Sequence, residues 1–219
     1  MSPNNPEGPD RDAALALYRQ RHAVYDIELS LYEPLRRDAV MRLGLREGDV
    51  VLDVGCGTGL SLALLRQCVG AGGRVVGIEQ SPEMIGHAQA LVRRHGWDNV
   101  ELICSPVEEV EIETAADAAM FHYVHDILRS PGALDRVVPK LAPGARVVAC
   151  GLRWAPAWAW PVNMLVLTAA VHSITSFEGL AAPWDDLATR IGGMEVESVY
   201  GGGAYLAYGI HKRSEIAAR

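Results

Sequence analysis

The stretch Val51-Leu-Asp-Val-Gly-Cys-Gly-Thr-Gly59 decides the fold of this 219-residue chain. Its apolar first half is typical of a buried strand, and three glycines then follow at alternate positions. Because glycine has no Cβ, such a turn lets a ligand lie directly against the backbone. The apolar run from Leu60 to Val69 predicts a helix after the turn. Strand, glycine turn and helix in this order indicate a nucleotide-like binding site.

Strands and helices are expected to alternate along the next hundred or so residues. The expected strands are Val50–Val54, Arg74–Glu79, Val100–Cys104, Ala116–His122 and Ala145–Leu152. The expected helices are one or two over residues 13–43, then Leu60–Val69, Pro82–His95 and Ala133–Leu141. Such alternation implies an α/β fold in which the strands pair in parallel through right-handed crossovers.

The end of the chain has a different pattern. Met194–Tyr200 and Ala204–Ile210 alternate apolar and polar residues, and three glycines, Gly201-Gly202-Gly203, join them. Two alternating runs around a glycine turn predict an antiparallel β-hairpin. The parallel sheet is therefore expected to close with an antiparallel pair, unlike the sheet of a dinucleotide-binding dehydrogenase.

The glycine spacing narrows the kind of site. Gly55-x-Gly57-x-Gly59 differs from the Gly-x-Gly-x-x-Gly of dinucleotide sites, whose third glycine would fall at Leu60. With Asp53 at the strand end, the segment closely resembles the first motif of class I (Rossmann-like) methyltransferases that depend on S-adenosyl-L-methionine (SAM). The resemblance covers roughly residues 45–152 and 190–211, about 60% of the chain. It implies a seven-stranded, mostly parallel sheet with helices on both faces, and S-adenosyl-L-homocysteine as product.

The resemblance also implies a set of cofactor contacts. Glu79 ends the second strand, twenty residues after Gly59, where a carboxylate can accept both ribose hydroxyls. The plainer alternatives are a helix-start carboxylate for Glu79, a turn-stabilising carboxylate for Asp53 and a core position for Met84. The implied cofactor residues are Tyr25, Asp53, Gly55, Cys56, Gly57, Gly59, Glu79, Gln80, Met84, Pro106, Val107 and His122.

The adenine side departs from the family pattern. Relatives often carry Gly-Asp-Ala after the third strand, and the aspartate receives the adenine amino group. This chain has Ser105-Pro106-Val107 at that place, so the carboxylate is missing. Glu108 or the backbone of Val107 is left to take its role.

The candidates for catalysis follow the fourth strand, in the run Phe121-His-Tyr-Val-His-Asp126. Histidine titrates near neutrality, so His122 or His125 is a candidate general base, and Asp126 could orient the ring of His125. Methyl transfer also proceeds by alignment and desolvation alone, and a base is needed only if the acceptor loses its proton early. In that alternative both histidines only line the pocket.

A segment without charge is expected to cover the acceptor. Trp154–Phe177 contains no Asp, Glu, Lys or Arg, which favours a lid insertion over residues 154–185. A face on a membrane surface and a spanning helix are the alternatives. An apolar lid favours an apolar or aromatic small-molecule acceptor, methylated at O, N or C. The expected substrate-binding residues are Tyr18, Tyr123, Trp154, Trp158, Trp160 and His172, although His172 and the tyrosines also suit simple packing.

Two further functions stay open from the sequence. One is a phospholipid or quinone methyltransferase at a membrane surface, and the other is a SAM-binding protein with different chemistry, such as cyclisation. A nucleic-acid partner is disfavoured, because the net charge is −7 and the pI is near 5.5. The basic pairs Arg36-Arg37 and Arg93-Arg94 are expected on solvated helix faces.

The remaining expectations concern the chain as a whole. The four cysteines lack the spacing of a zinc site and are expected to be buried free thiols in a reducing compartment. The polar first twelve residues do not read as a secretory signal and predict a disordered tail. Residues 13–219 are expected to form one cytoplasmic domain, as a monomer or homodimer.

Overall fold

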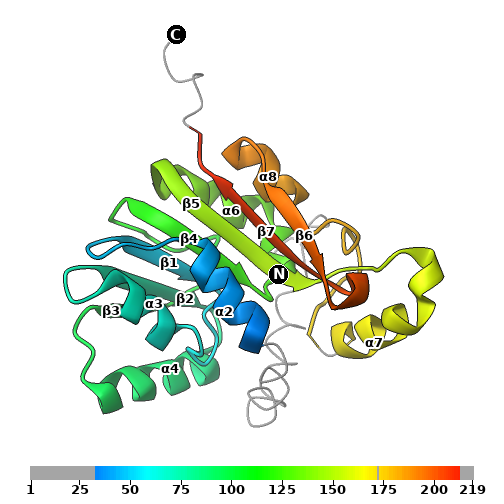
Figure 1. The fold of residues 1–219 in the computed structure, drawn as a ribbon. Coiled ribbons are helices and arrows are strands. Elements are labelled where there is room, and N and C mark those ends of the chain that lie inside the picture. The colour runs from blue at the N-terminus through cyan, green and yellow to red at the C-terminus, as the bar shows by residue number, and fades with distance from the viewer. Residues whose placement is uncertain (1–32, 172, 213–219) are drawn as a thin grey trace, which may run out of the picture.

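A central sheet organises the protein in a computed structural model that describes residues 33–171 and 173–212. Its seven strands lie in the order β3-β2-β1-β4-β5-β7-β6 (Figure 1). They are β1 (Val50–Val54), β2 (Arg74–Glu79), β3 (Val100–Cys104), β4 (Ala116–His122), β5 (Leu141–Leu152), β6 (Glu195–Val199) and β7 (Ala204–Ile210). Only β7 runs antiparallel to its neighbours β5 and β6, which confirms the predicted sheet and its closing hairpin.

The strand order reverses between β1 and β4. From β1 the chain moves outward to β2 and β3, and it then returns to place β4 and β5 on the other side of β1. In parallel α/β sheets, ligands bind at the carboxyl ends of the strands beside such a reversal. Asp53 near the end of β1 and His122 at the end of β4 therefore lie at the expected ligand edge.

Helices cover both faces of the sheet (Figure 1). On one face, α2 (Glu33–Arg42), α3 (Leu62–Val69) and α4 (Pro82–His95) share a core with β1, β4 and β5. On the other, α5 (His125–Leu128), α6 (Pro131–Val137) and α8 (Asp185–Ile191) complete a second core. Apolar residues at helical spacing, such as Leu62, Leu65 and Val69 of α3, supply these contacts and are fully buried.

Several element boundaries differ from the prediction, and three of them have a clear local cause. The glycine turn continues to Ser61, because the Leu62 amide still bonds to the Gly59 carbonyl, so α3 begins two residues later than expected. Helix α6 gives way to a 3₁₀ turn, Val138–Lys140, since Pro139 has no N–H for another helical bond. Strand β5 already begins at Leu141, which pairs with Ala116 before the register shifts.

The expected lid, residues 154–185, runs from the end of β5 to the first residue of α8. It contains a short 3₁₀ turn, Ala157–Ala159, and α7 (Trp160–Ala170), which extends away from the sheet (Figure 1). A small separate core holds α7 through its two buried residues, Val166 and Ala170. Within the described ranges, none of the helices is both long and apolar enough to cross a membrane.

Two expectations about side chains are wrong. Arg36 is only 2% exposed, although Arg37, Arg93 and Arg94 are on the surface as predicted. The cysteines are free thiols, but Cys68 and Cys104 are exposed, and burial holds only for the other two. Both errors arise because the sequence shows the spacing of residues along an element but not which neighbour covers it.

Some predictions concern residues outside the described ranges. They are the tail over residues 1–12, the part of the helical segment before residue 33, Tyr18, Tyr25 and His172. These remain predictions from the sequence.

Candidate functional site

The glycine turn is pressed between β2 and the chain that follows β4. The amides of Gly55 and Cys56 both donate to the Ile78 carbonyl, at 2.8 and 3.0 Å. Gly55 has φ +75°, and a Cβ there would lie 2.4 Å from Cγ1 of Val124. Because no larger residue fits this position, the glycine is required for packing as well as for backbone conformation. Packing therefore holds the turn in this conformation, and Gly55 and Gly57 remain half-buried.

Glu79 links the turn to the helix after β2. Its carboxylate is 6% exposed and accepts hydrogen bonds from the Gly57 amide at 3.1 Å and the Ser81 amide at 2.8 Å. Burial raises the pKa of Glu79, and the backbone hydrogen bonds from Ser81 and Gly57 oppose the rise. Glu79 thus does have the helix-start role. Each of its carboxylate oxygens has two lone pairs, so Glu79 can accept the ribose hydroxyls as well.

Asp53 is a buried carboxylate close to the turn. It is 2% exposed, and its Oδ2 atom has no hydrogen-bond partner within residues 33–171 and 173–212. Burial raises its pKa to about 7, against an opposing attraction from Arg36 and with a smaller repulsion from Glu79. A cationic ligand group would stabilise the charged form of this carboxylate and would supply the missing hydrogen-bond partner.

Arg36 is the site residue that the sequence interpretation missed. It lies on α2, which packs over β4 and β5, and its Nη1 atom donates to Glu33. Its Nε and Nη2 atoms are buried without a partner in the described part of the chain. A signal was available, because Arg36 shares a helix face with the apolar Ala39 and Val40, three and four residues later.

His122 ends β4 beside these two charges. Its Nε2 atom is buried and has no hydrogen-bond partner among the described residues. Burial, together with the smaller effect of the positive charge of Arg36, lowers the pKa of His122 to about 3. The ring is therefore neutral at physiological pH and available for hydrogen bonding and packing, rather than as a charged acid.

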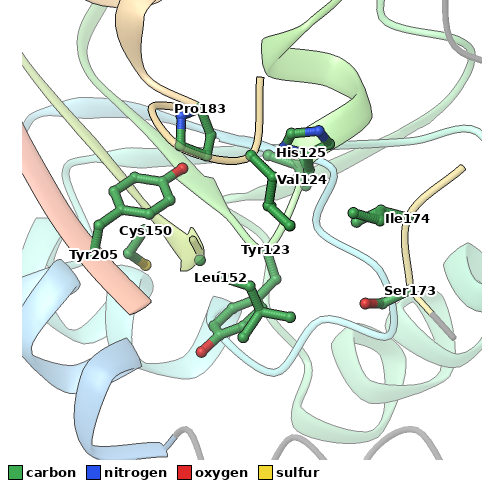
Figure 2. Close-up of a pocket in the computed structure, with 11 residues that line it drawn as sticks. Tyr123, Val124, His125, Cys150, Leu152, Ser173, Ile174, Pro183 and Tyr205 are labelled. Atoms are coloured by element: carbon green, nitrogen blue, oxygen red, sulfur yellow. The ribbon is translucent and has the colours of Figure 1, made fainter. Parts of the chain in front are cut away.

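A pocket opens next to the glycine turn. Figure 2 shows Tyr123 and Val124, just after β4, between Tyr205 of β7 and Ile174 of the lid. The space between the walls is about 290 Å³, part of it open to solvent. The lining residues are Tyr123, Val124, His125, Cys150, Gly151, Leu152, Ser173, Ile174, Leu180, Pro183 and Tyr205.

The pocket contacts the turn through a strained backbone. Tyr123 has φ +57°, a left-handed conformation that a bulky residue seldom adopts, and its amide donates to the Cys150 carbonyl at 2.8 Å. The following residue, Val124, lines the pocket and also packs on Gly55. The cofactor turn and the pocket thus share one wall.

His125 and Asp126 both bond to the lid. Nε2 of His125 lies 3.0 Å from the Glu178 carbonyl, and because a carbonyl only accepts, Nε2 carries the proton and Nδ1 the lone pair. Asp126 accepts from the amide of Thr175 at 3.2 Å and its hydroxyl at 2.9 Å. Burial lowers the pKa of His125, although the charge of Asp126 opposes it. Helix α5 therefore ties the lid at two points.

The other predicted cofactor residues that the structure describes are buried or half-buried. The Cys56 sulfur packs against Gly77 of β2, and Met84 is 3% exposed beneath Gly57. Pro106 and Val107 are buried, and Gln80 is half-buried. Glu108, an alternative for adenine, accepts a hydrogen bond from the Ser130 hydroxyl.

The lid tryptophans divide into two groups. Trp154 is half-buried and stacks on Phe177, with ring centroids 5.9 Å apart. Trp158 and Trp160 are 81% and 67% exposed and are not among the residues that line the pocket. In this arrangement neither of the exposed rings reaches an acceptor held there.

Known proteins share this architecture. A family model described as "Methyltransferase domain" matches residues 45–167, more than half of the chain. The methyltransferase solved in complex with the Trm112 methyltransferase activator of Haloferax volcanii superposes with a TM-score of 0.66 at 16% identity. That likeness covers 92% of this chain and 98% of the other, and at such low identity it shows the fold alone.

Curated relatives differ in their substrates. The chain is 48% identical over 61 residues to protein-L-isoaspartate O-methyltransferase 2 of Archaeoglobus fulgidus, 28% of each protein. It is 31% identical over 144 residues to the chloroplastic 2-phytyl-1,4-beta-naphthoquinone methyltransferase of Arabidopsis thaliana, which is 60% of this chain and 54% of that protein. The chain thus spans about half, or less, of the length of these relatives.

The raised pKa of Asp53 predicts a pH-dependent stability. The folded protein holds this proton up to about pH 7, whereas the unfolded chain releases it near the ordinary value of 3.8. Folding therefore loses stability as the pH rises from about 4 to 7. Asp53→Asn removes this titration, so the free energy of unfolding of the native protein should fall relative to that of the variant across the window. Urea denaturation at several pH values measures the difference, and parallel curves would contradict the assignment.

Proposed function

We propose that this chain, which belongs to the methyltransferase-domain family, transfers the methyl group of SAM to an uncharged apolar or aromatic small molecule. The acceptor atom is oxygen, nitrogen or carbon. One observation carries the proposal: none of the described residues that line the pocket beside the glycine turn is an Asp, Glu, Lys or Arg.

The residues at the turn suit the cofactor. SAM supplies a methyl group on a positively charged sulfur. We assign the half-buried backbone of Gly55 and Gly57 to its methionine part, and the unused buried oxygen of Asp53 to its ammonium group. Glu79, fixed by two backbone amides, keeps lone pairs for the ribose hydroxyls. A fixed carboxylate loses little entropy on binding, which favours tight recognition of the ribose.

The walls of the pocket suit a compact, neutral acceptor. Val124, Leu152, Ile174 and Leu180 contribute apolar surface. The hydroxyl-bearing side chains of Tyr123, Tyr205 and Ser173 can place one polar group of the acceptor. Ligand pockets commonly have this mixture of apolar walls and a few hydrogen-bonding groups, which favours a small uncharged molecule as the acceptor.

The acceptors named for the two curated relatives differ in charge, and this difference bears on the choice of an uncharged acceptor. An isoaspartate side chain carries a negative carboxylate, and a site for it would need a cation, which is absent from the described residues of these walls. A naphthoquinone is aromatic and apolar, as these walls require. The proposed acceptor is therefore closer in polarity to the naphthoquinone than to the isoaspartate side chain.

We assign most of the acceleration of the methyl transfer to the alignment of the acceptor with the methyl group. The neutral His125 keeps its lone pair on Nδ1, but its lowered pKa makes it a weak base. Holding acceptor and methyl group in line in a pocket shielded from water supplies much of the acceleration of such a displacement. In this proposal His125 and Asp126 position the lid over the acceptor.

Cofactor binding is the first test. Calorimetric titration should show binding of SAM and S-adenosyl-L-homocysteine but not of NADH. Glu79→Ala should weaken SAM binding by about 1–3 kcal/mol, because it removes charged hydrogen bonds to the ribose. Glu101→Ala, on the exposed edge strand β3, is the control and should have no effect. Binding of NADH alone would refute the function, and an unchanged affinity in Glu79→Ala would remove Glu79 from the ribose.

The acceptor class is the second test. Release of S-adenosyl-L-homocysteine should occur with uncharged aromatic compounds and not with their carboxylated or aminated analogues. Ile174→Glu places a charge in the wall and should raise the acceptor KM by about tenfold or more, with SAM affinity unchanged. Val171→Glu, exposed on the same segment, is the matched control. Preferred turnover of charged analogues would overturn the acceptor assignment.

The role of His125 is the third test, made with an acceptor found in that screen. If His125 ties the lid, His125→Ala loses one hydrogen bond and should raise the acceptor KM by about two- to tenfold, with kcat nearly unchanged. Thr175→Val weakens the other tie and should act in the same way. A fall in kcat of about a hundredfold or more in His125→Ala alone would instead show a general base.

A further inference from the structure

The exposed apolar side chains of this protein concentrate on the lid. Among the described residues, eleven large apolar side chains are exposed, and seven of them belong to the segment Trp154–Phe177. They are Trp158, Trp160, Met164, Leu165, Leu167, Val171 and Phe177. Exposed apolar residues are ordinary when they are scattered singly, whereas a contiguous group marks an interaction surface. The lid is therefore a candidate surface for a partner.

One side of α7 carries most of this group. Successive residues of an α-helix are rotated by about 100° around its axis. That rotation gathers the exposed residues of α7, together with Val171, in an arc of about 160°, and it leaves the buried Val166 and Ala170 on the other side. The residues of this arc, which we call the lid face, are Trp160, Pro161, Met164, Leu165, Leu167, Thr168 and Val171. Surface helices normally carry polar residues on the side that faces solvent, but on the lid face only Thr168 is polar.

The lid face offers few side-chain hydrogen bonds to a partner. The hydroxyl of Thr168 already donates to the Met164 carbonyl at 2.9 Å, which leaves the indole N–H of Trp160 and that of the neighbouring Trp158. The segment Trp154–Phe177 has no charged side chain to pair with one on a partner. A typical protein–protein interface has a polar rim and about ten hydrogen bonds, whereas the hydrocarbon boundary of a lipid bilayer requires neither. The chemistry of the lid face therefore favours lipid over a protein.

We propose that the lid face docks on the surface of a zwitterionic phospholipid bilayer, with α7 parallel to the membrane plane. The eleven residues of α7 span about 16 Å, about half of the hydrocarbon thickness of a bilayer. The side chains of Trp158 and Trp160 combine a large apolar body with one N–H donor, which suits the boundary between headgroups and acyl chains. The chain has a net charge of −7, which disfavours an anionic surface and makes neutral headgroups the better match.

The lid face is also connected to the pocket. Leu180 shares a small core with Val166 and Ala170 of α7, and it lines the pocket as well. Docking of α7 therefore brings the pocket close to the bilayer, where apolar metabolites accumulate. The docking itself does not depend on the proposed function, because it needs neither SAM nor an acceptor.

Flotation of the full chain with phosphatidylcholine vesicles, in the absence of SAM, tests the docking. The native protein should float with the vesicles, and its partition coefficient should change less than about twofold between about 0.1 and 0.5 M NaCl, because no charge attraction contributes. Leu165→Glu puts a charge in the lid face and should lower the partition coefficient at least about tenfold. Met41→Glu on α2 is the matched control, since Met41 is 69% exposed and Leu165 is 72% exposed, and it should float like the native protein.

Several results would overturn the docking. A native protein that stays with the soluble fraction would do so, whether residues 1–32 or a second copy of the chain cover the lid face. Sedimentation velocity identifies the second copy as a dimer that Leu165→Glu, but not Met41→Glu, converts to monomers. Flotation that high salt abolishes, or that both variants weaken equally, would also contradict a lid face held by apolar contact. Titration with SAM is a separate measurement, so the docking and the proposed function can fail independently.

Discussion

The contact between Gly55 and Val124 is the constraint on which the rest of the site depends. A Cβ at residue 55 would overlap Val124, so the glycine turn after β1 and the chain after β4 can approach only without one. This approach also brings Val124 into the pocket wall. A cofactor lying along the turn is therefore separated from an acceptor in the pocket by very little protein, as a direct transfer between them requires.

Around this contact the protein places buried polar groups that have few partners of their own. Glu79 is the exception, because two backbone amides fix it and it stabilises the turn without a ligand. Asp53, Arg36 and His122 instead keep unused atoms. Leaving such groups unsatisfied costs stability, and proteins accept that cost most often where a ligand restores the hydrogen bonds. We therefore expect these unsatisfied groups to lower the stability of the ligand-free protein and to raise its affinity for the cofactor.

The sequence predicted correctly those features that depend on residues close together in the chain. Alternating strands and helices, the glycine spacing and the final hairpin predicted the sheet, and the position of Glu79 at the end of β2 followed from its distance along the chain. Contacts between distant segments were not predictable in this way. The burial of Arg36 depends on α2 lying over β4 and β5, and the bond between His125 and the Glu178 carbonyl joins residues 53 positions apart. The outward direction of Trp158 and Trp160 likewise depends on how the lid packs.

A crystal structure of the complex with S-adenosyl-L-homocysteine is the most direct measurement of the central claim. The account predicts that the homocysteine end lies along Gly55 and Gly57, with its ammonium on Asp53 and its sulfur toward Val124 and the pocket. A product bound at another edge of the sheet, or one whose sulfur faces away from the pocket, would contradict it.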